Sequence, residues 1–242
     1  MLPNIALDQL LLLDIETTPA VKAFDCLPEN MQSLWLDKIA KTAPDSSEGE
    51  ELYADRAGIF AEFGKIVCIS VGFFTVENGR YQLRIKSIYH DDEKLLLSSF
   101  LELVNKFYIK NPKFQFAGHN IKEFDIPFIC RRSVINLLSL PPALQLHNLK
   151  PWEVPMLDTM QLWRFGDFKN YTSLKLLTAV LGIPTPKDDI DGSMVAKVYY
   201  GEANGLERIV TYCQKDVVAV GQLLMRFKGV PLIEDGDVVY IK

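Results

Sequence analysis

The sequence predicts an α/β protein in which helices cover a mixed β-sheet. Three observations lead to this prediction: a short apolar run near the N-terminus, two alternating segments joined by a turn, and amphipathic stretches that alternate with further apolar runs. Strands in a meander, followed by strands that alternate with helices, are typical of a mixed sheet with helices on its faces. A hydrophobic fraction of 48% with 24% charged residues supplies enough apolar material for one large core.

Five segments have the length and composition of strands. The first is an apolar run closed by Pro19, and its shortness favours a buried strand over a helix. The second and third are rich in β-branched or alternating apolar residues, and the turn signal at Asn78 and Gly79 between them predicts an antiparallel hairpin. The five predicted strands cover residues 10–17, 64–74, 80–89, 114–118 and 155–162.

Helices are predicted where apolar residues recur at helical spacing behind acidic or capping residues. Residues 25–64 interrupt this pattern, because they are acidic and rich in turn formers around short helical pieces. We therefore expect a single domain over residues 1–242 with an insertion at about 25–64. The predicted helices cover residues 29–39, 91–107, 126–138, 173–181, 194–200 and 206–227, with a turn over 183–192.

Charge and composition exclude several classes of protein. With 26 Lys and Arg against 31 Asp and Glu, the net charge of −5 excludes a protein that grips long duplexes over its whole surface. The four cysteines form no C-x-x-C pair, which argues against a zinc site or a disulfide framework. The apolar run at residues 10–13 ends at Asp14 and has no basic leader, so we expect no signal peptide, no membrane segment and a cytoplasmic location.

Pairs of acidic residues separated by one position occur six times, so this spacing alone indicates nothing. Asp14 and Glu16 differ from the other pairs because they follow three leucines in the predicted central strand, where residues i and i+2 point to the same face. Two carboxylates beside a core need cations, hydrogen bonds or protons, and a divalent metal supplies the first of these. The alternative is that the strand ends at Asp14 and that both acids cap the next turn in water.

Two later segments also carry candidate acids, each with a plain structural alternative. Asp125 lies at a predicted loop-to-helix junction, where it is a plausible helix cap, and Asn120 is a turn former. Tyr212 and Asp216 lie four residues apart on one face of a predicted helix, where surface pairing and packing would also explain them. Together, these alternatives leave unexplained why a strand, a junction and a late helix each supply an acid in this order.

Three short motifs contain the candidate residues, and they read LDIET (Asp14, Glu16), HNIKEFD (Asn120, Phe124, Asp125) and YCQKD (Tyr212, Asp216). In these motifs the chain resembles the DEDD superfamily of 3′-to-5′ exonucleases, and the tyrosine of the last motif resembles the DEDDy branch. In particular, about residues 9–228 resemble the proofreading exonuclease domain of family B DNA polymerases, in a stand-alone form. The resemblance implies an RNase H-like fold, with a mixed five-stranded sheet flanked by helices.

The resemblance also implies a metal centre that hydrolyses phosphodiester bonds and releases nucleoside 5′-monophosphates. Carboxylate oxygens are hard ligands that suit two Mg²⁺ or Mn²⁺ ions. In the family's pattern, Asp14 would bridge both ions, and Glu16 and Asp216 would hold the ion on the nucleophile side. Asp125 would serve the leaving-group side. Tyr212 would orient the attacking water, because a phenol with a pKa near ~10 is a poor base at neutral pH.

The substrate that the resemblance implies is an unpaired 3′ end, with single-stranded DNA preferred. Asn120 and Phe124 carry over from the family as residues beside the terminal nucleotide, and Thr17, directly after the strand acids, is expected at the terminal sugar. A polymerase or a repair protein is a candidate partner, and no membrane is expected. The alternatives are an RNA exonuclease of the same chemistry and a catalytically silent nucleic-acid-binding module.

Two surface features fit a local grip on nucleic acid. Residues 106–132 hold six basic residues against two acids. Aromatic and cationic residues alternate over 163–171, a pattern typical of stacking platforms for single strands, with Phe165, Phe168 and Tyr171 as candidate base contacts. The alternative is a strand end that feeds the core, which accounts at least for Trp163.

Two further residues near the motifs are not assigned to catalysis. His119 is expected to be a strand-end residue with a hydrogen-bonded ring, because the histidine base of other DEDD branches lies in the third motif. Asp158 is interpreted either as a support beside the site or as purely structural.

Overall fold

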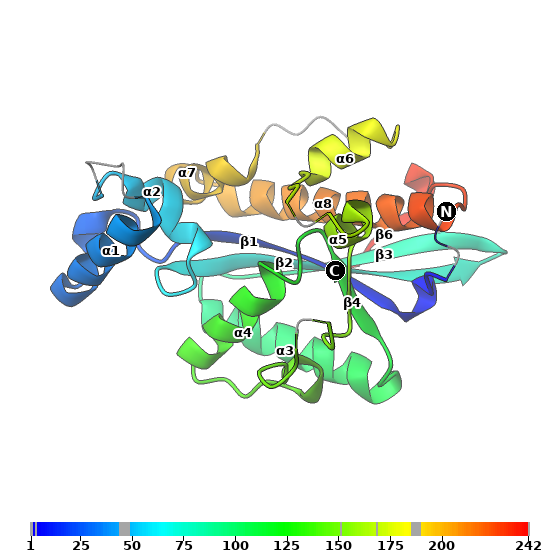
Figure 1. Cartoon of the computed structure of the whole chain (residues 1–242), viewed down its shortest axis with the longest axis horizontal. Coiled ribbons are helices and arrows are strands. Elements are labelled where there is room, and N and C mark those ends of the chain that lie inside the picture. Colours follow the sequence, from blue (N-terminus) through cyan, green and yellow to red (C-terminus); the bar gives the residue numbers. More distant parts are fainter. Residues whose placement is uncertain are drawn as a thin grey trace.

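The described residues form one mixed sheet of six strands that runs through the molecule (Figure 1). The computed structural model describes residues 2, 4–43, 49–150, 152–167, 169–184 and 190–241. The sheet order is β5-β4-β1-β2-β3-β6, which places β1 between a parallel partner, β4, and an antiparallel partner, β2. The strands are β1 (Leu10–Pro19), β2 (Gly64–Glu77), β3 (Arg80–Tyr89), β4 (Gln115–Gly118), β5 (Met156–Asp158) and β6 (Val238–Ile241).

The predicted α/β class and the predicted hairpin of β2 and β3 are confirmed, whereas two details of the sheet are wrong. The predicted strand over 155–162 stops at Asp158, because its carboxylate accepts hydrogen bonds from the backbone nitrogens of Met160 and Gln161 and so begins a helix. A sixth strand, β6, pairs in parallel with β3 at the edge of the sheet. Its short apolar run follows the last predicted helix and adds to the five strands expected.

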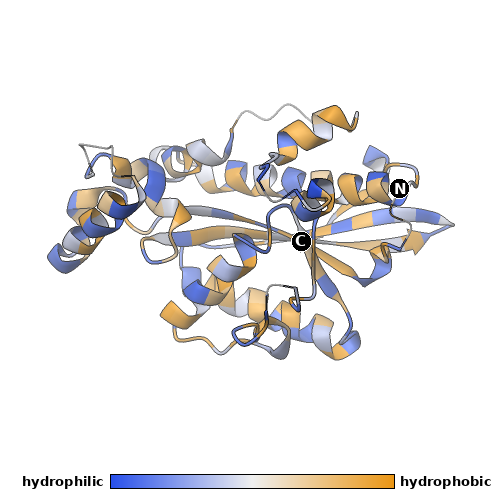
Figure 2. Ribbon diagram, viewed as in Figure 1, coloured by the Kyte–Doolittle hydropathy of each residue, from blue (hydrophilic) through white to orange (hydrophobic). Residues whose placement is uncertain are grey.

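Helices cover both faces of this sheet (Figure 1), and Figure 2 shows mixed apolar and polar colouring around them. α3 and α4 contact one face, and α8 contacts the other, with α6 and α7 packed against α8. Within the described ranges, no helix has both the length and the apolar character needed to cross a membrane. Residues 185–189 of the predicted turn lie outside the described residues. The helices are α1 (Glu29–Thr42), α2 (Leu52–Arg56), α3 (Glu93–Lys110), α4 (Asp125–Ile135), α5 (Thr159–Arg164), α6 (Leu174–Val180), α7 (Val195–Gly201) and α8 (Gly205–Lys228).

β1 contributes to the apolar cores on both sides of the sheet. Leu11 and Leu13 belong to the cluster that includes residues of α3 and α4. Leu10 and Leu12 belong to the cluster that includes residues of α8. Because side chains alternate along a strand, the next even-numbered positions of β1 continue the row that faces α8. The alternation along β1 therefore predicts that Asp14 and Glu16 lie on the side of the sheet that α8 covers.

Residues 25–64 include α1 and α2, which lie near one end of β1 (Figure 1). They have an aromatic cluster of their own, in which the ring of Trp35 meets Tyr53 and Phe63 edge-on with centroids 5.2 Å apart in each case. Trp35 Nε1 also donates a hydrogen bond to the carbonyl oxygen of Gly49 at 2.8 Å. The predicted helix over 29–39 extends to Thr42. We retain, as a proposal, the interpretation of this segment as an insertion within a single domain.

Candidate active site

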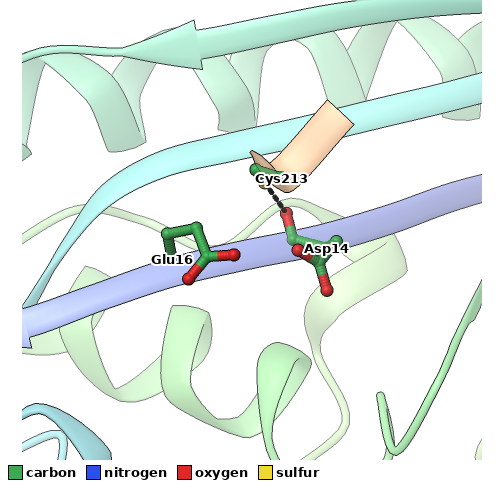
Figure 3. A group of neighbouring side chains, drawn as sticks. All are labelled: Asp14, Glu16 and Cys213. Carbon is green, nitrogen blue, oxygen red and sulfur yellow. Dashed lines mark hydrogen bonds between the residues drawn. The ribbon is translucent and has the colours of Figure 1, made fainter. Parts of the chain in front are cut away.

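The two acids of β1 lie next to each other on the face that α8 covers (Figure 3). Glu16 is buried and Asp14 is half-buried. Their carboxylates and the thiol of Cys213 each offer a ligand atom, and these atoms lie within 4.8 Å of one another. β1 continues to pair with β2 as far as Pro19. The alternative in which the strand ends at Asp14 is therefore wrong.

Asp125 lies near these acids, beside the part of β1 that β4 no longer pairs with. β4 pairs with β1 only as far as Leu12, and it packs so closely there that a Cβ on Gly118 would lie 2.8 Å from a β1 carbonyl oxygen. Beyond this point the backbone N–H of Ile15 donates to Oδ1 of Asp125 at 3.2 Å. Asp125 is the first residue of α4, and the N-cap position belongs to Phe124. The interpretation of Asp125 as a helix cap is therefore wrong.

α8 supplies the third part of the site. Cys213 is fully buried, and its Sγ donates to the backbone carbonyl oxygen of Asp14 at 3.4 Å, as the dashed line in Figure 3 shows. The hydroxyl of Tyr212 hydrogen-bonds to the carboxylate of Asp216. The charge of Asp216 raises the pKa of both Asp14 and Glu16, although Asp216 is not in the group whose ligand atoms all lie within 4.8 Å of one another. Five predicted site residues from β1, α4 and α8 thus come together.

Burial and mutual repulsion raise the pKa values of these acids. For Asp14, burial is the largest cause of the raised pKa, followed by the charges of Asp216 and Asp125. For Glu16, burial again raises the pKa most, followed by the charges of Asp14 and Asp216. Burial raises the pKa of Asp125 to about 7, even though backbone hydrogen bonds act in the opposite direction. A cluster of this kind holds protons unless a cation replaces them.

The acid cluster fits a divalent cation. Its carboxylate oxygens are the ligand type that Mg²⁺ and Mn²⁺ prefer. Oδ2 of Asp14 is buried and has no hydrogen-bond partner among the described residues, and an unpaired buried charge is unfavourable. A cation would supply the missing partner. The four acids of the three motifs therefore form a candidate metal centre.

Cys213 is a member of this site that the sequence analysis does not single out. Burial is the largest cause of its raised pKa, followed by its contact with Cys68, so the thiol remains a protonated donor to β1. The sequence holds a signal that would have identified it. Cys213 and Asp216 are three residues apart, and residues at that spacing share a helix face.

Asp158 holds the loop that leads to Asp125. Its Oδ1 accepts a hydrogen bond from the backbone nitrogen of Asn120 at 3.0 Å, and its Oδ2 accepts one from that of Lys122 at 3.2 Å. The same carboxylate caps α5. Asn120 adopts a positive φ of 63°, and its side-chain Oδ1 is buried without a hydrogen-bond partner in the described part of the chain. Asp158 therefore acts as a support beside the acids.

The ring of His119 is held on both sides. Nδ1 lies 2.9 Å from Oγ1 of Thr159, and Nε2 lies 2.8 Å from the carbonyl oxygen of Thr172. Burial is the main cause of the lowered pKa of His119. This geometry agrees with the expected strand-end residue with a hydrogen-bonded ring.

The remaining predicted substrate residues lie at the edges of the acid cluster. Thr17 follows Glu16 across an irregularity in the pairing of β1 with β2, and its side chain is half-buried. Phe124 directly precedes Asp125, and its half-buried ring lies 5.4 Å from that of Phe128. Part of the Phe124 ring therefore packs on the core.

The expected basic surface over 106–132 is smaller than the sequence predicts. Arg132 is buried, and its Nε donates to Oε1 of Glu93 at 2.9 Å, so this guanidinium does not face solvent. A run of charges in the sequence does not reveal which of its members points inward. The exposed cations of the range are Lys106, Lys110, Lys113 and Arg131.

This fold and site define a class: α/β proteins with acids on the central strand, at a neighbouring loop–helix junction and on a covering helix. A family model described as the RNase H superfamily matches residues 56–227, which is more than half of the chain. The chain therefore belongs to the RNase H superfamily. The matched range begins after β1, so it contains Asp125, Tyr212 and Asp216 but not the two strand acids.

A solved structure with a similar fold is that of the family B DNA polymerase from the hyperthermophilic archaeon Pyrobaculum calidifontis. The similarity covers 89% of this chain and 24% of the polymerase chain, with a TM-score of 0.51 and 14% sequence identity. The chain thus spans about a quarter of that polymerase, and the likeness shows a common fold. No curated protein matches the sequence. The RNase H-like fold that the three motifs predict is confirmed.

Proposed function

We propose that this protein is a metal-dependent 3′-to-5′ exonuclease that trims single-stranded DNA and releases nucleoside 5′-monophosphates. The observation that carries this proposal is the convergence of four carboxylates from β1, α4 and α8, with Tyr212 hydrogen-bonded to one of them. Membership of the RNase H superfamily supports a nuclease. The order of the three motifs favours the exonuclease branch, and the resemblance to a polymerase domain favours DNA and a polymerase or repair partner.

Asp14, Glu16, Asp125 and Asp216 would hold the two divalent ions. When bound, such ions lower the pKa of water and neutralise charge on the phosphoryl and leaving oxygens. After burial, the charges of Asp216 and Asp125 raise the pKa of Asp14, so Asp14 lies within electrostatic reach of both carboxylates. This supports Asp14 as a ligand of the metal centre, and its contact with both ions is what the family pattern implies.

Tyr212 would orient the attacking water and would not act as its base. Burial and the charges of three acids, first among them Asp216, raise its pKa, so its Oη keeps its proton at neutral pH. The hydroxyl donates that proton in a hydrogen bond to Asp216. Its lone pairs remain available to accept a hydrogen bond from water. Tyr212 can therefore orient the attacking water without accepting the proton that this water loses.

The residues around the acids would position the terminal nucleotide. The unpartnered Oδ1 of Asn120 is an acceptor for a hydroxyl or amino group of substrate. Thr17 offers a hydroxyl group beside Glu16, and Phe124 offers a partly exposed ring edge. Since only four side chains of residues 106–132 are exposed cations, the grip on the rest of the strand is expected to be weak, with a shallow dependence on salt.

The test is cleavage of a 5′-labelled single-stranded DNA in Mg²⁺, with matched RNA and recessed duplex as further substrates. We expect a ladder that shortens from the 3′ end, inhibition by EDTA, and resistance of an oligonucleotide whose 3′-terminal linkage is phosphorothioate. Asp216→Asn should abolish the ladder. The matched control is Asp235→Asn, because Asp235 is an exposed acid next to β6, at the far edge of the sheet.

Each contrary outcome identifies an alternative. Much faster cleavage of RNA than of DNA would replace the proposed substrate while leaving the chemistry intact. Internal cuts would contradict the exonuclease assignment. Binding of DNA without any cleavage, in the presence of Mg²⁺ or Mn²⁺, would support a catalytically silent module and overturn the proposal.

A further inference from the structure

Two aromatic side chains stand in solvent close to the loop that carries Asp125. Phe165 is 76% exposed and Tyr171 is 67% exposed. Phe165 also has a positive φ of 45°, which a bulky residue rarely adopts, and Gly166 follows it with a φ of 92°. Phe168, the third aromatic residue predicted here, lies outside the described residues. This left-handed conformation makes Phe165 the C-cap that ends α5, but core packing does not explain why its large ring stands in solvent.

Arg164 ties the two segments that carry the exposed rings to each other. Its side chain is only 9% exposed, and its Nε donates to the carbonyl oxygen of Asn170 at 3.0 Å. This bond joins the residue before Phe165 to the residue before Tyr171. The other end of the guanidinium, Nη1, donates to Oε1 of Glu123 at 3.2 Å. One cation therefore fixes both aromatic positions to the loop that ends at the catalytic acid of α4.

A second contact fixes the segment on the other side of Tyr171. The carbonyl oxygen of Thr172 lies 2.8 Å from Nε2 of His119, the residue directly before Asn120. Tyr171 thus lies between two carbonyl groups that are both tied to residues 119–123. By contrast, Trp163, in the same aromatic stretch, packs against the α8 side of the core. The alternative that assigned Trp163 to the core is confirmed on this point, but the residue lies in α5 and not at a strand end. Core packing therefore accounts for Trp163 but not for Phe165 or Tyr171.

We propose that Phe165 and Tyr171 form a stacking site for unpaired bases of the strand that enters the active site, on the 5′ side of the terminal nucleotide. The inference rests on the proposed function for the identity of its substrate. Aromatic rings held on a fixed frame accept any base, because every base has a π-face. The exposed Lys169 lies between them in the chain and supplies a cation for the backbone. The hydrogen bonds of Arg164 and Thr172 link this site to Glu123 and His119, which lie in the chain next to Asn120 and Asp125.

The test measures binding without hydrolysis. A 5′-fluorescein-labelled oligothymidylate is titrated in EDTA, and its fluorescence anisotropy is followed. Phe165→Ala and Tyr171→Ala should each weaken binding roughly 10-fold, as expected for loss of one base–aromatic stack. Phe165→Trp and Tyr171→Phe should bind like the wild type, because they keep a ring. Tyr240→Ala is the matched control, since Tyr240 is 55% exposed on β6, at the opposite edge of the sheet.

Two further measurements separate stacking from a general loss of structure. The slope of log affinity against log salt should stay unchanged in both alanine variants, because no phosphate contact is removed. The double variant Phe165→Ala/Tyr171→Ala is compared with the wild type on an oligonucleotide that has abasic positions on the 5′ side of its terminal nucleotide. Both proteins should bind this oligonucleotide equally weakly, because it offers no base for the rings to stack on. In Mg²⁺, the variants should raise KM for long substrates with little change in kcat.

The proposal is overturned if both alanine variants bind the oligothymidylate with wild-type affinity, or if the conservative variants lose as much affinity as the alanine variants. These outcomes are distinct from failure of the proposed function. A protein that does not trim DNA, but whose binding depends on the two rings, would keep the stacking site and lose the exonuclease assignment. If instead the protein trims DNA and both alanine variants bind with wild-type affinity, the exonuclease assignment is kept and the stacking site is lost.

Discussion

Two acid pairs with the same spacing, Asp14/Glu16 and Asp91/Glu93, are used in opposite ways by this fold. Glu16 is 7% exposed and Glu93 is 8% exposed, so both are buried to the same degree. Glu93 meets the guanidinium of Arg132, with Nε 2.9 Å from Oε1. Glu16 meets other carboxylates, whose charges raise its pKa after burial has done so.

The difference shows that the partner, not the spacing, decides the role of a buried acid. Glu93 also accepts a hydrogen bond from the backbone nitrogen of Ile66 at 2.8 Å, and Asp91 accepts one from the hydroxyl of Tyr199 at 2.7 Å. Asp91 and Glu93 therefore find their hydrogen-bond and ion-pair partners within the protein, and these contacts hold the start of α3 in place. In the proposed function, a cation from solution would complete the first pair.

Asp14→Asn is expected to have the largest effect on activity. Loss of one proposed metal ligand removes several kcal/mol of electrostatic stabilisation, so cleavage should fall roughly 10³-fold or more. The thermal stability of the metal-free variant should equal or exceed that of the wild type, because a repelled charge is gone. Asp91→Asn is the control and should keep its activity. Full activity of Asp14→Asn in the labelled-strand assay would remove Asp14 from the catalytic centre.

Arg132→Met is expected to have the largest effect on stability. It leaves the carboxylate of Glu93 buried without its cation, which costs about 3–5 kcal/mol. Urea unfolding measures this change. The double variant Glu93→Gln/Arg132→Met should recover part of the loss, because no buried charge remains unpaired. A loss below about 1 kcal/mol in the single variant would mean that Glu93 behaves as a solvent-exposed acid.

The stability of the metal-free protein should fall as the pH rises from about 5 to about 8. Asp125 has a pKa of about 7 in the fold, raised from 3.8, and the pKa values of Asp14 and Glu16 are also raised. The protonated forms therefore stabilise the fold below pH 4, and this contribution is lost as the pH passes through 7. We expect the Tm to fall by roughly 5–10 °C.

Divalent metal should reverse that pH dependence. Thermal scans with Mn²⁺ should show the greatest rise in Tm at pH 8, where the acids are ionised and free to bind. Asp14→Asn should flatten the curve of the metal-free protein. A Tm that rises between pH 5 and pH 8 without metal would contradict the assignment of raised pKa values to this cluster.

Tyr212→Phe is expected to have the smallest of these effects. Loss of the hydroxyl should lower kcat about 10–100-fold, as for other groups that orient a reacting species through a hydrogen bond. Metal affinity should remain close to that of the wild type, because all four carboxylates are kept. The pH profile of kcat should keep its shape. A shift of its basic limb would instead make the tyrosine a base.

The strand, the hairpin and the three motifs could be predicted from the sequence because each has a local signal. Apolar runs, turn residues and helical spacing depend on neighbours in the chain. The same signals placed the acids of β1 on one face and Tyr212 beside Asp216. These local signals failed where one side chain determines the end of an element. The carboxylate of Asp158 caps α5, so β5 ends there although the apolar pattern continues.

Long-range contacts could not be predicted from local patterns. Nothing in the surroundings of Asp125 in the chain reveals that its carboxylate binds the backbone of Ile15, 110 residues away. Nor does the basic run reveal that Arg132 turns inward to Glu93. The short edge strand β6 has an apolar run as its signal, but its parallel partner, β3, is distant in the sequence.

The most direct test of the metal centre is isothermal titration calorimetry of Mn²⁺ and Mg²⁺ into the purified protein at neutral pH. We predict two ions per chain for the wild type, with protons released as the acids ionise, and loss of this binding in Asp14→Asn. Wild-type protein that binds no divalent ion, or Asp14→Asn that binds two ions as tightly as the wild type, would contradict the account.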